Sequence, residues 1–295
     1  MSYKSGFVTI VGRPNVGKST LINKIIGEKI AIMSNKPQTT RNKIQCVYTE
    51  DDFQIVFLDT PGIHKPKNKL GKYMTNVAWD ALKEVDVIIF MTDEDSSVGK
   101  GDDYIINQLA HINTPKVLVL NKIDRLKKDK IVDIVKQFEA YNVFDNIVPI
   151  SSLNGKNINN LIEVLKEIIP EGPQYFPKDM ITDQPERLII GEIIREKALH
   201  YLDQEIPHGI AVDINKIEKR KDGEIIDILA TIYCERDSHK GIIIGKNGRK
   251  LKGIGKSARI DIERLLGSKI YLDLWVKVSK NWRDKENIVK RMGYK

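Results

Sequence analysis

Residues 12–19, near the start of the chain, read GRPNVGKS and match the spacing G-x-x-x-x-G-K-S. Glycines let backbone amides approach phosphate oxygens closely, and the N-terminus of a following helix adds partial positive charge. At this spacing Lys18 would reach the outer phosphates of a nucleotide, and the Ser19 hydroxyl would bind Mg²⁺. An ordinary glycine turn is the alternative. An apolar run (7–12) before the segment and a helical pattern (18–27) after it favour a phosphate-binding loop.

Two further segments would complete a metal site. DTPG (59–62) ends the apolar run that begins at residue 53, so Asp59 would support Mg²⁺ through water and Gly62 would offer its N–H to the γ-phosphate. Between the two segments lies KPQTTR (36–41). Either Thr39 or Thr40 would serve as a Mg²⁺ contact, and spacing alone does not separate them.

The segment NKID (121–124) predicts the base. The Asp124 carboxylate only accepts hydrogen bonds, and guanine offers N1–H and an exocyclic amine side by side, whereas adenine does not. Asn121 would tie the surrounding loops together, and the Lys122 stem would lie against the base. In SSL (151–153), after a fifth apolar run, a backbone N–H would meet the guanine O6. These residues predict GTP or GDP rather than ATP, which argues against an ATP-dependent enzyme or kinase.

These segments resemble the G1, G3, G4 and G5 motifs of translation-factor-like GTPases, and KPQTTR resembles switch I of the Era-type bacterial GTPases. The resemblance implies Thr40 rather than Thr39 as the Mg²⁺ contact, catalytic roles for Lys18, Thr40 and Gly62, and Mg²⁺ held by Ser19, Thr40 and Asp59. The nucleotide-binding residues that follow are Gly12, Asn15, Val16, Gly17, Lys18, Ser19, Thr20, Asp59, Gly62, Asn121, Lys122, Asp124, Ser151, Ser152 and Leu153.

One position indicates slow intrinsic hydrolysis. Ras-like enzymes place a glutamine after the DTPG-type turn to orient the attacking water, and this chain has Ile63 there. A partner would then have to assist the reaction. Alternatively, Asn15 resembles the asparagine with which related GTPases hold a K⁺ ion near the phosphates. The competing interpretation of Asn15 is a simple loop residue.

A second group of residues, GKNG (245–248), lies in the C-terminal part. Paired glycines permit close approach to a sugar–phosphate backbone, and the segment resembles the G-x-x-G loop of KH domains, which clamps single-stranded nucleic acid. Trp275 and Trp282 could both stack on bases, although buried packing is the favoured interpretation of Trp275. The predicted RNA-binding residues are Gly245, Lys246, Asn247, Gly248, Arg249, Lys250 and Lys252.

The order of apolar runs predicts two folds. Runs at 7–12, 53–62, 86–93, 116–124 and 147–152 alternate with helical patterns, which indicates an α/β P-loop GTPase domain with a mostly parallel sheet over residues 1–170. A proline-rich linker is expected at 171–186. An α+β KH domain of type II-like topology, with a basic C-terminal tail, is expected at 187–295.

The composition of the chain limits the class of protein and the kind of partner it can have. Of 295 residues two are cysteines, in no metal-like spacing, so a disulfide framework is unsupported and a reducing compartment fits. We expect no signal peptide and no membrane-spanning segment, because no apolar run is long enough. The formal net charge is +8, and residues 239–295 hold 16 Lys and Arg against five Asp and Glu, which favours a polyanionic partner.

Over the whole chain, the order of GTPase domain, linker and KH domain resembles the Era-type GTPases. The resemblance implies binding near the 3′ end of 16S rRNA rather than to DNA, and a role in 30S subunit assembly. It also implies peripheral association with the inner membrane, expected to be weak because no amphipathic anchor is visible. The reducing compartment indicates a cytoplasmic protein, and a monomer is the default because no self-complementary heptad or edge strand stands out. GTP would control RNA binding only if the switch loops contact the KH domain or the linker. The alternative function is an RNA-binding assembly module in which nucleotide is mainly structural.

Overall fold

The computed structural model describes residues 2–34, 36, 38–63, 65–93, 98–203, 206–220 and 223–294. Their contacts divide the chain into two compact units. Unit 1 comprises Met1–Ala31, Thr40–Lys65 and Met74–Asp183, and unit 2 comprises Ile32–Thr39, Pro66–Tyr73 and Gln184–Lys295. Each unit has its own apolar core, so we describe them separately.

Unit 1 is an α/β layer structure whose sheet has the strand order β2-β3-β1-β4-β5-β6. All neighbouring strands pair in parallel except β2 and β3, so the predicted, mostly parallel sheet is confirmed. The strands are β1 (Lys4–Val11), β2 (Ile44–Thr49), β3 (Phe53–Asp59), β4 (Val87–Thr92), β5 (Lys116–Leu120) and β6 (Asn146–Pro149). Parallel strands end at one edge, which collects the segments that follow them.

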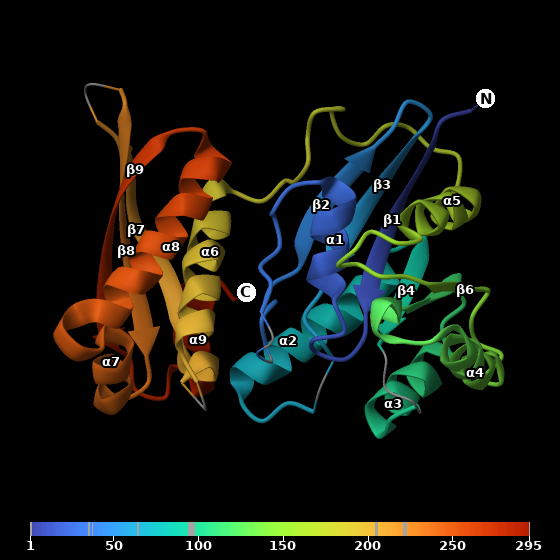
Figure 1. Cartoon of the computed structure of the whole chain (residues 1–295), viewed down its shortest axis with the longest axis horizontal. Coiled ribbons are helices and arrows are strands. Elements are labelled where there is room, and N and C mark those ends of the chain that lie inside the picture. The colour runs from blue at the N-terminus through green and yellow to red at the C-terminus, as the bar shows by residue number, and fades with distance from the viewer. Residues whose placement is uncertain are drawn as a thin grey trace. The chain divides into compact units, whose positions relative to one another are not determined.

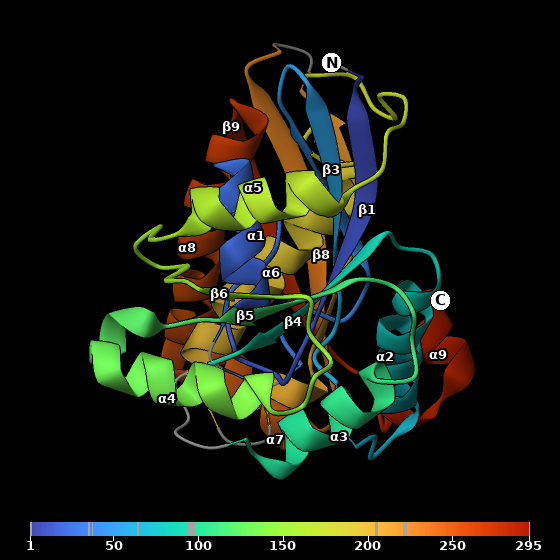
Figure 2. The same cartoon turned by 90° about the vertical axis from the view of Figure 1, so that its right-hand side faces the viewer.

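Helices cover both faces of this sheet (Figures 1 and 2). On one face, α1 (Lys18–Ile26) and α5 (Ile158–Ile168) share an apolar cluster with the strands. On the other, α2 (Lys69–Asp80), α3 (Lys100–Leu109) and α4 (Lys128–Glu139) form a second cluster. The strands are therefore buried on both sides, which explains their nearly continuous apolar sequences. Gly27 ends α1 in the left-handed conformation, which glycine adopts readily.

The segment predicted as a linker packs along unit 1 as far as Asp183. The side chain of Gln54 accepts hydrogen bonds from the backbone N–H groups of Tyr175 and Phe176, each at 2.9 Å. Thr182 forms an isolated bridge to Cys46 in β2. This extended segment thus follows the antiparallel edge of the sheet before unit 2 begins.

Unit 2 has a sheet of order β7-β8-β9, in which β7 and β8 are antiparallel and β8 and β9 parallel. Its elements run in the order α6 (Glu186–Tyr201), β7 (Ala211–Lys219), β8 (Ile225–Cys234), α7 (Asp237–Ile244), α8 (Arg249–Leu266), β9 (Lys269–Val278) and α9 (Glu286–Arg291). Helices α6 and α8 lie side by side on one face of the sheet (Figure 1). Among the described residues no helix combines the length and hydropathy needed to cross a membrane.

The two tryptophans differ from the expectation. Trp275 in β9 is 57% exposed, whereas Trp282 is fully buried and donates its indole N–H to the Gly209 carbonyl at 2.8 Å. The favoured burial of Trp275 was therefore wrong, and so was the availability of Trp282 for stacking, whereas the exposed Trp275 agrees with the alternative interpretation. In β9 the even-numbered residues Ile270 and Val276 face the core, so the odd-numbered Trp275 must point to the opposite face.

Candidate functional site

The first candidate site lies at the carboxyl edge of the unit 1 sheet. Residues 12–17 connect β1 to α1, and the N-terminus of α1 follows directly at Lys18. Gly17 has φ +108°, and a Cβ atom there would lie 2.2 Å from the Asn121 amide nitrogen. The loop therefore needs glycine at this position for two reasons, backbone conformation and space.

Three hydroxyl and carboxyl groups meet beside the phosphate-binding loop. The Ser19 Oγ donates to Asp59 Oδ2 at 2.7 Å and lies 3.0 Å from Thr40 Oγ1, which is 3.3 Å from the same carboxylate oxygen. Thr39 lies elsewhere, because its hydroxyl donates to the carbonyl of Lys36 at 2.6 Å. The structure thus brings Thr40, and not Thr39, to the predicted metal residues.

The Asp59 carboxylate fits a magnesium ion. It is fully buried, and its Oδ1 has no hydrogen-bond partner among the described residues. Burial raises the pKa of this group, since the charged form has lost its hydration. A hard cation prefers a set of oxygen ligands such as Ser19, Thr40 and Asp59, and would supply the missing positive charge.

The Lys18 ammonium is held within the candidate phosphate-binding loop. Its ammonium donates to the carbonyls of Gly12 at 3.3 Å and Arg13 at 3.0 Å. Burial lowers the pKa of Lys18 to about 8, although Asp59 opposes the shift. An anionic ligand would stabilise the charged form of this lysine. Gly62 lies against the same loop, where a Cβ atom would be 2.8 Å from the Pro14 nitrogen.

The base-recognition residues converge on Asn121, which follows β5. Its amide donates to the Val16 carbonyl at 2.8 Å, and its Oδ1 accepts from the N–H and the hydroxyl of Ser152, both at 2.9 Å. Asn121 therefore ties the phosphate-binding loop to residues 151–153, as predicted. The Asp124 carboxylate is exposed and accepts a hydrogen bond from Ser151 Oγ at 2.5 Å. This contact orients the carboxylate that the sequence assigns to guanine.

The remaining predicted residues lie around this centre. Asn15 has φ +69°, Thr20 is in the first turn of α1, and Leu153 is 70% exposed. Lys122 also has positive φ, and its ammonium pairs with Asp93 at 2.6 Å.

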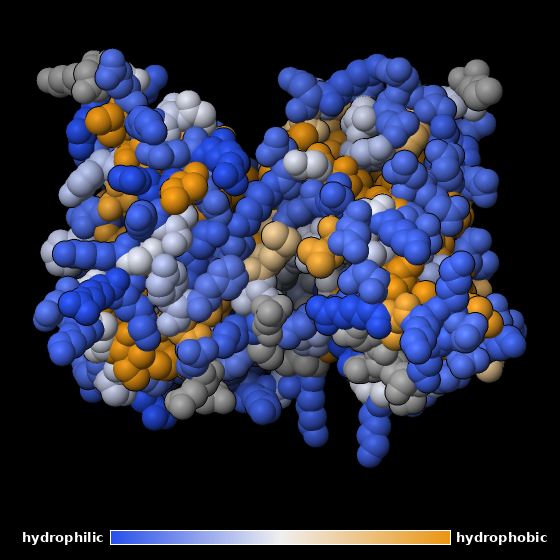
Figure 3. Space-filling view, in the orientation of Figure 1, coloured by the Kyte–Doolittle hydropathy of each residue, from blue (hydrophilic) through white to orange (hydrophobic). Residues whose placement is uncertain are grey.

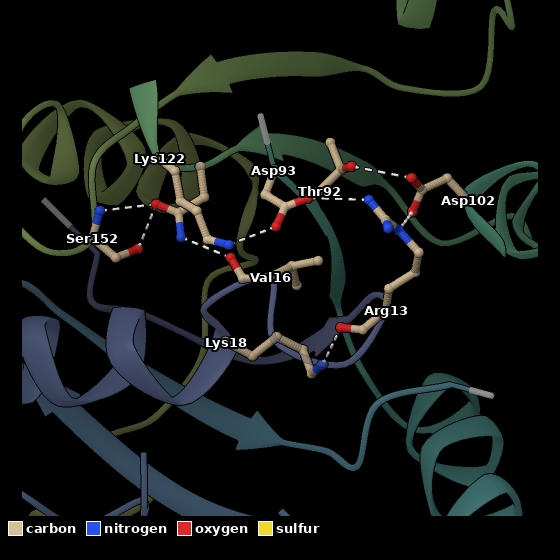
Figure 4. Close-up of polar contacts among 9 residues, drawn as sticks. Arg13, Val16, Lys18, Thr92, Asp93, Asp102, Lys122 and Ser152 are labelled. Atoms are coloured by element: carbon tan, nitrogen blue, oxygen red, sulfur yellow. Dashed lines mark hydrogen bonds and ion pairs between the residues drawn. The ribbon is translucent and has the colours of Figure 1, made fainter. Parts of the chain in front are cut away.

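An ionic network near this lysine was missed by the sequence reasoning. Arg13 of the phosphate-binding loop pairs with Asp93 at 3.0 Å and with Asp102 of α3 at 2.9 Å (Figure 4). Asp102 is 1% exposed and also accepts from Thr92 Oγ1 at 3.3 Å. Asp93 pairs with both Arg13 and Lys122, so one carboxylate links the phosphate-binding loop to the NKID segment (121–124). The residues are too far apart in the sequence for a motif to reveal the network.

Removing the buried member of this network should destabilise unit 1. We expect Asp102→Ala to lower the free energy of unfolding by about 1–3 kcal/mol, because Arg13 loses a charged partner. Asp129→Ala is the matched control, since Asp129 is an exposed acidic residue in the first turn of α4 and Asp102 lies in the first turn of α3. Asp129→Ala should lower the free energy of unfolding by only about 0.3–1 kcal/mol. Urea unfolding without nucleotide measures both, and equal effects would contradict the role of the network.

The second candidate site is the loop between α7 and α8 in unit 2. Gly245, Asn247 and Gly248 all have positive φ, at 72°, 52° and 74°. A Cβ atom on Gly245 would lie 2.8 Å from the Lys250 Cβ, so the loop has no room for a side chain there. Lys246 and Asn247 are exposed at the tip, ahead of the N-terminus of α8. The loop presents backbone and a cation outward, which suits a phosphate backbone.

The basic surface extends further along α8 than predicted. Arg249 and Lys252 are exposed, while Lys250 is half-buried. Lys256 and Arg259 are exposed at spacings of seven and ten residues from Arg249, so they share its helical face. Helical periodicity was the signal that could have found them. On the other side of the loop, Figure 3 shows an apolar group within hydrophilic surface over α7, where Ile242 is 44% exposed.

Comparison with known proteins identifies two domains in this chain. The family model described as "50S ribosome-binding GTPase" matches residues 7–122, and a KH domain model matches residues 205–283. Fold and sites thus define a P-loop GTPase with a C-terminal KH domain. The GTPase Era of Alkaliphilus oremlandii (strain OhILAs) is 65% identical over 294 residues, covering 100% of both chains. The chain belongs to the Era family of GTPases.

Two solved structures resemble the whole chain, each with a TM-score of 0.96 and coverage of 99% of both chains. One, 41% identical, is Era in complex with MgGDPNP and nucleotides 1506–1542 of 16S ribosomal RNA. The other, 42% identical, is a variant of Aquifex aeolicus Era bound to GDP and AlF4⁻. The predicted family and fold class are therefore confirmed.

Proposed function

We propose that this chain is a GTP-hydrolysing switch that binds the 3′ end region of 16S ribosomal RNA and assists assembly of the 30S subunit. The observation that carries the proposal is the full-length similarity to Era bound to both MgGDPNP and the 16S segment. This chain has its own candidate residues for each ligand. Ser19, Thr40 and Asp59 would hold Mg²⁺, Asp124 would select guanine, and residues 245–248 would clamp RNA.

Two segments beside the nucleotide-site residues belong to unit 2, which supports the idea of a switch. Ile32–Thr39 and Pro66–Tyr73 lie next to Thr40 and the DTPG segment in sequence, yet their contacts group them with unit 2. The ring of Tyr73 lies 6.2 Å from that of Tyr294, and Lys69 is 4.0 Å from Glu286. In GTPases, γ-phosphate and Mg²⁺ order such segments. Contacts that differ between nucleotide states would couple GTP to RNA binding.

The alternative is an RNA-binding assembly module in which nucleotide is mainly structural. Ile63 favours it, because this side chain is 5% exposed and packs in an apolar cluster where Ras-like enzymes place a glutamine. We propose a slow intrinsic rate of hydrolysis for the same reason. The catalytic assignments of Lys18, Thr40 and Gly62 belong to the switch proposal.

Potassium is the proposed assisting cation. We expect K⁺ in place of Na⁺ to raise the rate of GTP hydrolysis about tenfold or more, because a positive charge near the β- and γ-phosphates stabilises the transition state. Asn15→Gly removes the side chain while tolerating φ +69° and should abolish the difference between the two salts. Steady-state hydrolysis at constant ionic strength measures both effects. Equal rates in Na⁺ and K⁺ would remove K⁺ from the proposal.

RNA affinity in two nucleotide states tests the switch. The probe is a single-stranded RNA equivalent to nucleotides 1506–1542 of 16S rRNA, titrated at fixed salt with GDP or with GDPNP present. Different dissociation constants support the switch, and equal constants favour the structural role of nucleotide. If the RNA does not bind in either state, the proposed target is wrong.

The remaining assignments are proposals of the same kind. We propose that the GTPase part, the linker and the KH part comprise residues 1–170, 171–186 and 187–295, and that the protein is a cytoplasmic monomer. Weak electrostatic association with the inner membrane rests on the basic residues 239–295. Co-sedimentation with anionic vesicles, reversed by about 0.5 M salt, would be the expected behaviour.

A further inference from the structure

Among the described residues of the segment 32–39, contacts with helix α6 or the residues just after it within unit 2 are made by Met33, Lys36, Gln38 and Thr39. Ile32 is buried in the apolar core of this unit. The Met33 N–H donates to Glu196 Oε2 at 3.0 Å, and the Met33 carbonyl lies 3.2 Å from His200 Nε2. Lys36 pairs with Asp203, just beyond α6, at 2.8 Å. Backbone and side chains of the segment are thus both held by α6 and the residues that follow it.

Arg195 on α6 contacts the two residues that directly precede Thr40 in the sequence. Its side chain is fully buried and pairs with Glu192 through Nε at 2.8 Å and Nη2 at 2.5 Å. Nη1 donates to the Gln38 carbonyl at 3.3 Å, and Nη2 donates to the Thr39 carbonyl. Glu192 neutralises the guanidinium, and the rigid fork directs its other donors to two consecutive carbonyls. Lysine, with a single nitrogen, cannot reproduce this pattern.

The Thr39 carbonyl belongs to the same peptide group as the Thr40 nitrogen. That group is planar and rigid, so a donor that fixes the Thr39 oxygen also limits the orientation of Thr40. The Thr40 hydroxyl lies 3.0 Å from Ser19 Oγ and 3.3 Å from Asp59 Oδ2. Arg195 therefore acts one peptide bond away from a candidate metal ligand, although 155 positions separate Arg195 from Thr40 in the sequence.

We propose that Arg195 is a positioning residue for GTP hydrolysis, which holds the Thr39 carbonyl so that Thr40 is oriented toward the metal and the γ-phosphate. This inference rests on the proposed function of Thr40. It assigns to helix α6 of unit 2 a direct effect on the rate of GTP hydrolysis, without RNA. Glu192 supports it by neutralising and aligning the buried guanidinium.

Steady-state GTP hydrolysis by the full chain tests the inference. We expect Arg195→Gln to lower kcat about tenfold or more and to leave the affinity for GDP within about twofold, because GDP lacks the γ-phosphate. The control is Arg187→Gln on the same helix, where the guanidinium contacts the Asn215 carbonyl instead. Arg187→Gln should leave kcat unchanged. An unchanged kcat in Arg195→Gln would overturn the inference.

A double-mutant cycle with Thr40→Ala separates this inference from the proposed function. If Arg195 acts through Thr40, Arg195→Gln should have no further effect on kcat in the Thr40→Ala background. An equal loss in both backgrounds would overturn the positioning role. If Thr40→Ala itself leaves kcat unchanged, the proposed role of Thr40 fails instead, and the positioning role fails with it.

A second variant covers loss of folding. Arg195→Lys keeps a charge beside Glu192 but cannot reach both carbonyls. We expect its melting temperature, measured by circular dichroism, to be close to that of the unmodified chain. Its kcat should be lower than that of the unmodified chain and higher than that of Arg195→Gln. Unmodified kcat in Arg195→Lys would show that charge alone suffices and would overturn the inference.

Discussion

Asp124→Asn is expected to reduce the affinity for GDP about 100- to 10,000-fold and to create affinity for xanthosine diphosphate. Guanine presents N1–H and an amine to the carboxylate, and each hydrogen bond to a charged group contributes about 1.5–3 kcal/mol. Asparagine removes the charge and turns one acceptor into a donor, which then faces the guanine amine. Xanthine has a carbonyl in place of that amine, so the asparagine side chain would pair with it.

The structure explains why this substitution should act locally. Asp124 follows β5 in a short helical turn, Ile123–Arg125, and is exposed, so its replacement removes no core contact. Asp124 Oδ1 accepts from Ser151 Oγ at 2.5 Å, and an asparagine carbonyl oxygen can accept the same bond. The loop should therefore keep its conformation, and the change in affinity should report base recognition.

Titration with fluorescent GDP and xanthosine diphosphate measures the effect. Ser151→Ala is the control, since it removes the orienting hydroxyl and keeps the carboxylate. We expect a smaller loss, about tenfold, and no affinity for xanthine, because the net value of one hydrogen bond is about 1 kcal/mol. Full affinity for GDP in Asp124→Asn would place the base away from NKID and contradict the assignment of the site.

The double variant Lys246→Asp, Asn247→Asp is expected to weaken RNA binding about 100-fold or more. It changes the formal charge at the tip of the loop by three units, where the sequence and fold place a phosphate backbone. The loop should stay folded, because aspartate tolerates the left-handed conformation that Asn247 adopts at φ +52°. We also expect a shallower dependence of affinity on salt, since fewer counterions are released.

A matched variant separates the loop from general electrostatics. Lys136→Asp, Gln137→Asp makes the same change of charge at exposed positions of α4 in unit 1. It should alter RNA affinity less than about threefold, because it leaves the charge of the GKNG loop unchanged and salt screens exposed charges. Filter binding or anisotropy at two salt concentrations measures both variants. Equal losses would mean that net charge, and not the loop, controls binding.

The sequence alone determined the classes of both sites. GRPNVGKS, DTPG and NKID are each a short, unbroken stretch of sequence, and motifs of this kind bind their ligands mainly through local backbone and a few adjacent side chains. Their order after apolar runs was sufficient to predict the parallel sheet. The alternation of apolar residues in β9 also predicted that Trp275 is exposed. We gave more weight to the general tendency of large aromatic residues to be buried, which was wrong here.

Only the tertiary structure decided which residues from distant segments meet. It placed Thr40 rather than Thr39 beside Ser19 and Asp59, although two adjacent threonines are equivalent by spacing. It joined Arg13 to Asp102, and it placed Arg195 on the Thr39 carbonyl. These contacts depend on how strands and helices pack, because side chains far apart in the sequence are brought within hydrogen-bonding distance only by the packing of the whole fold.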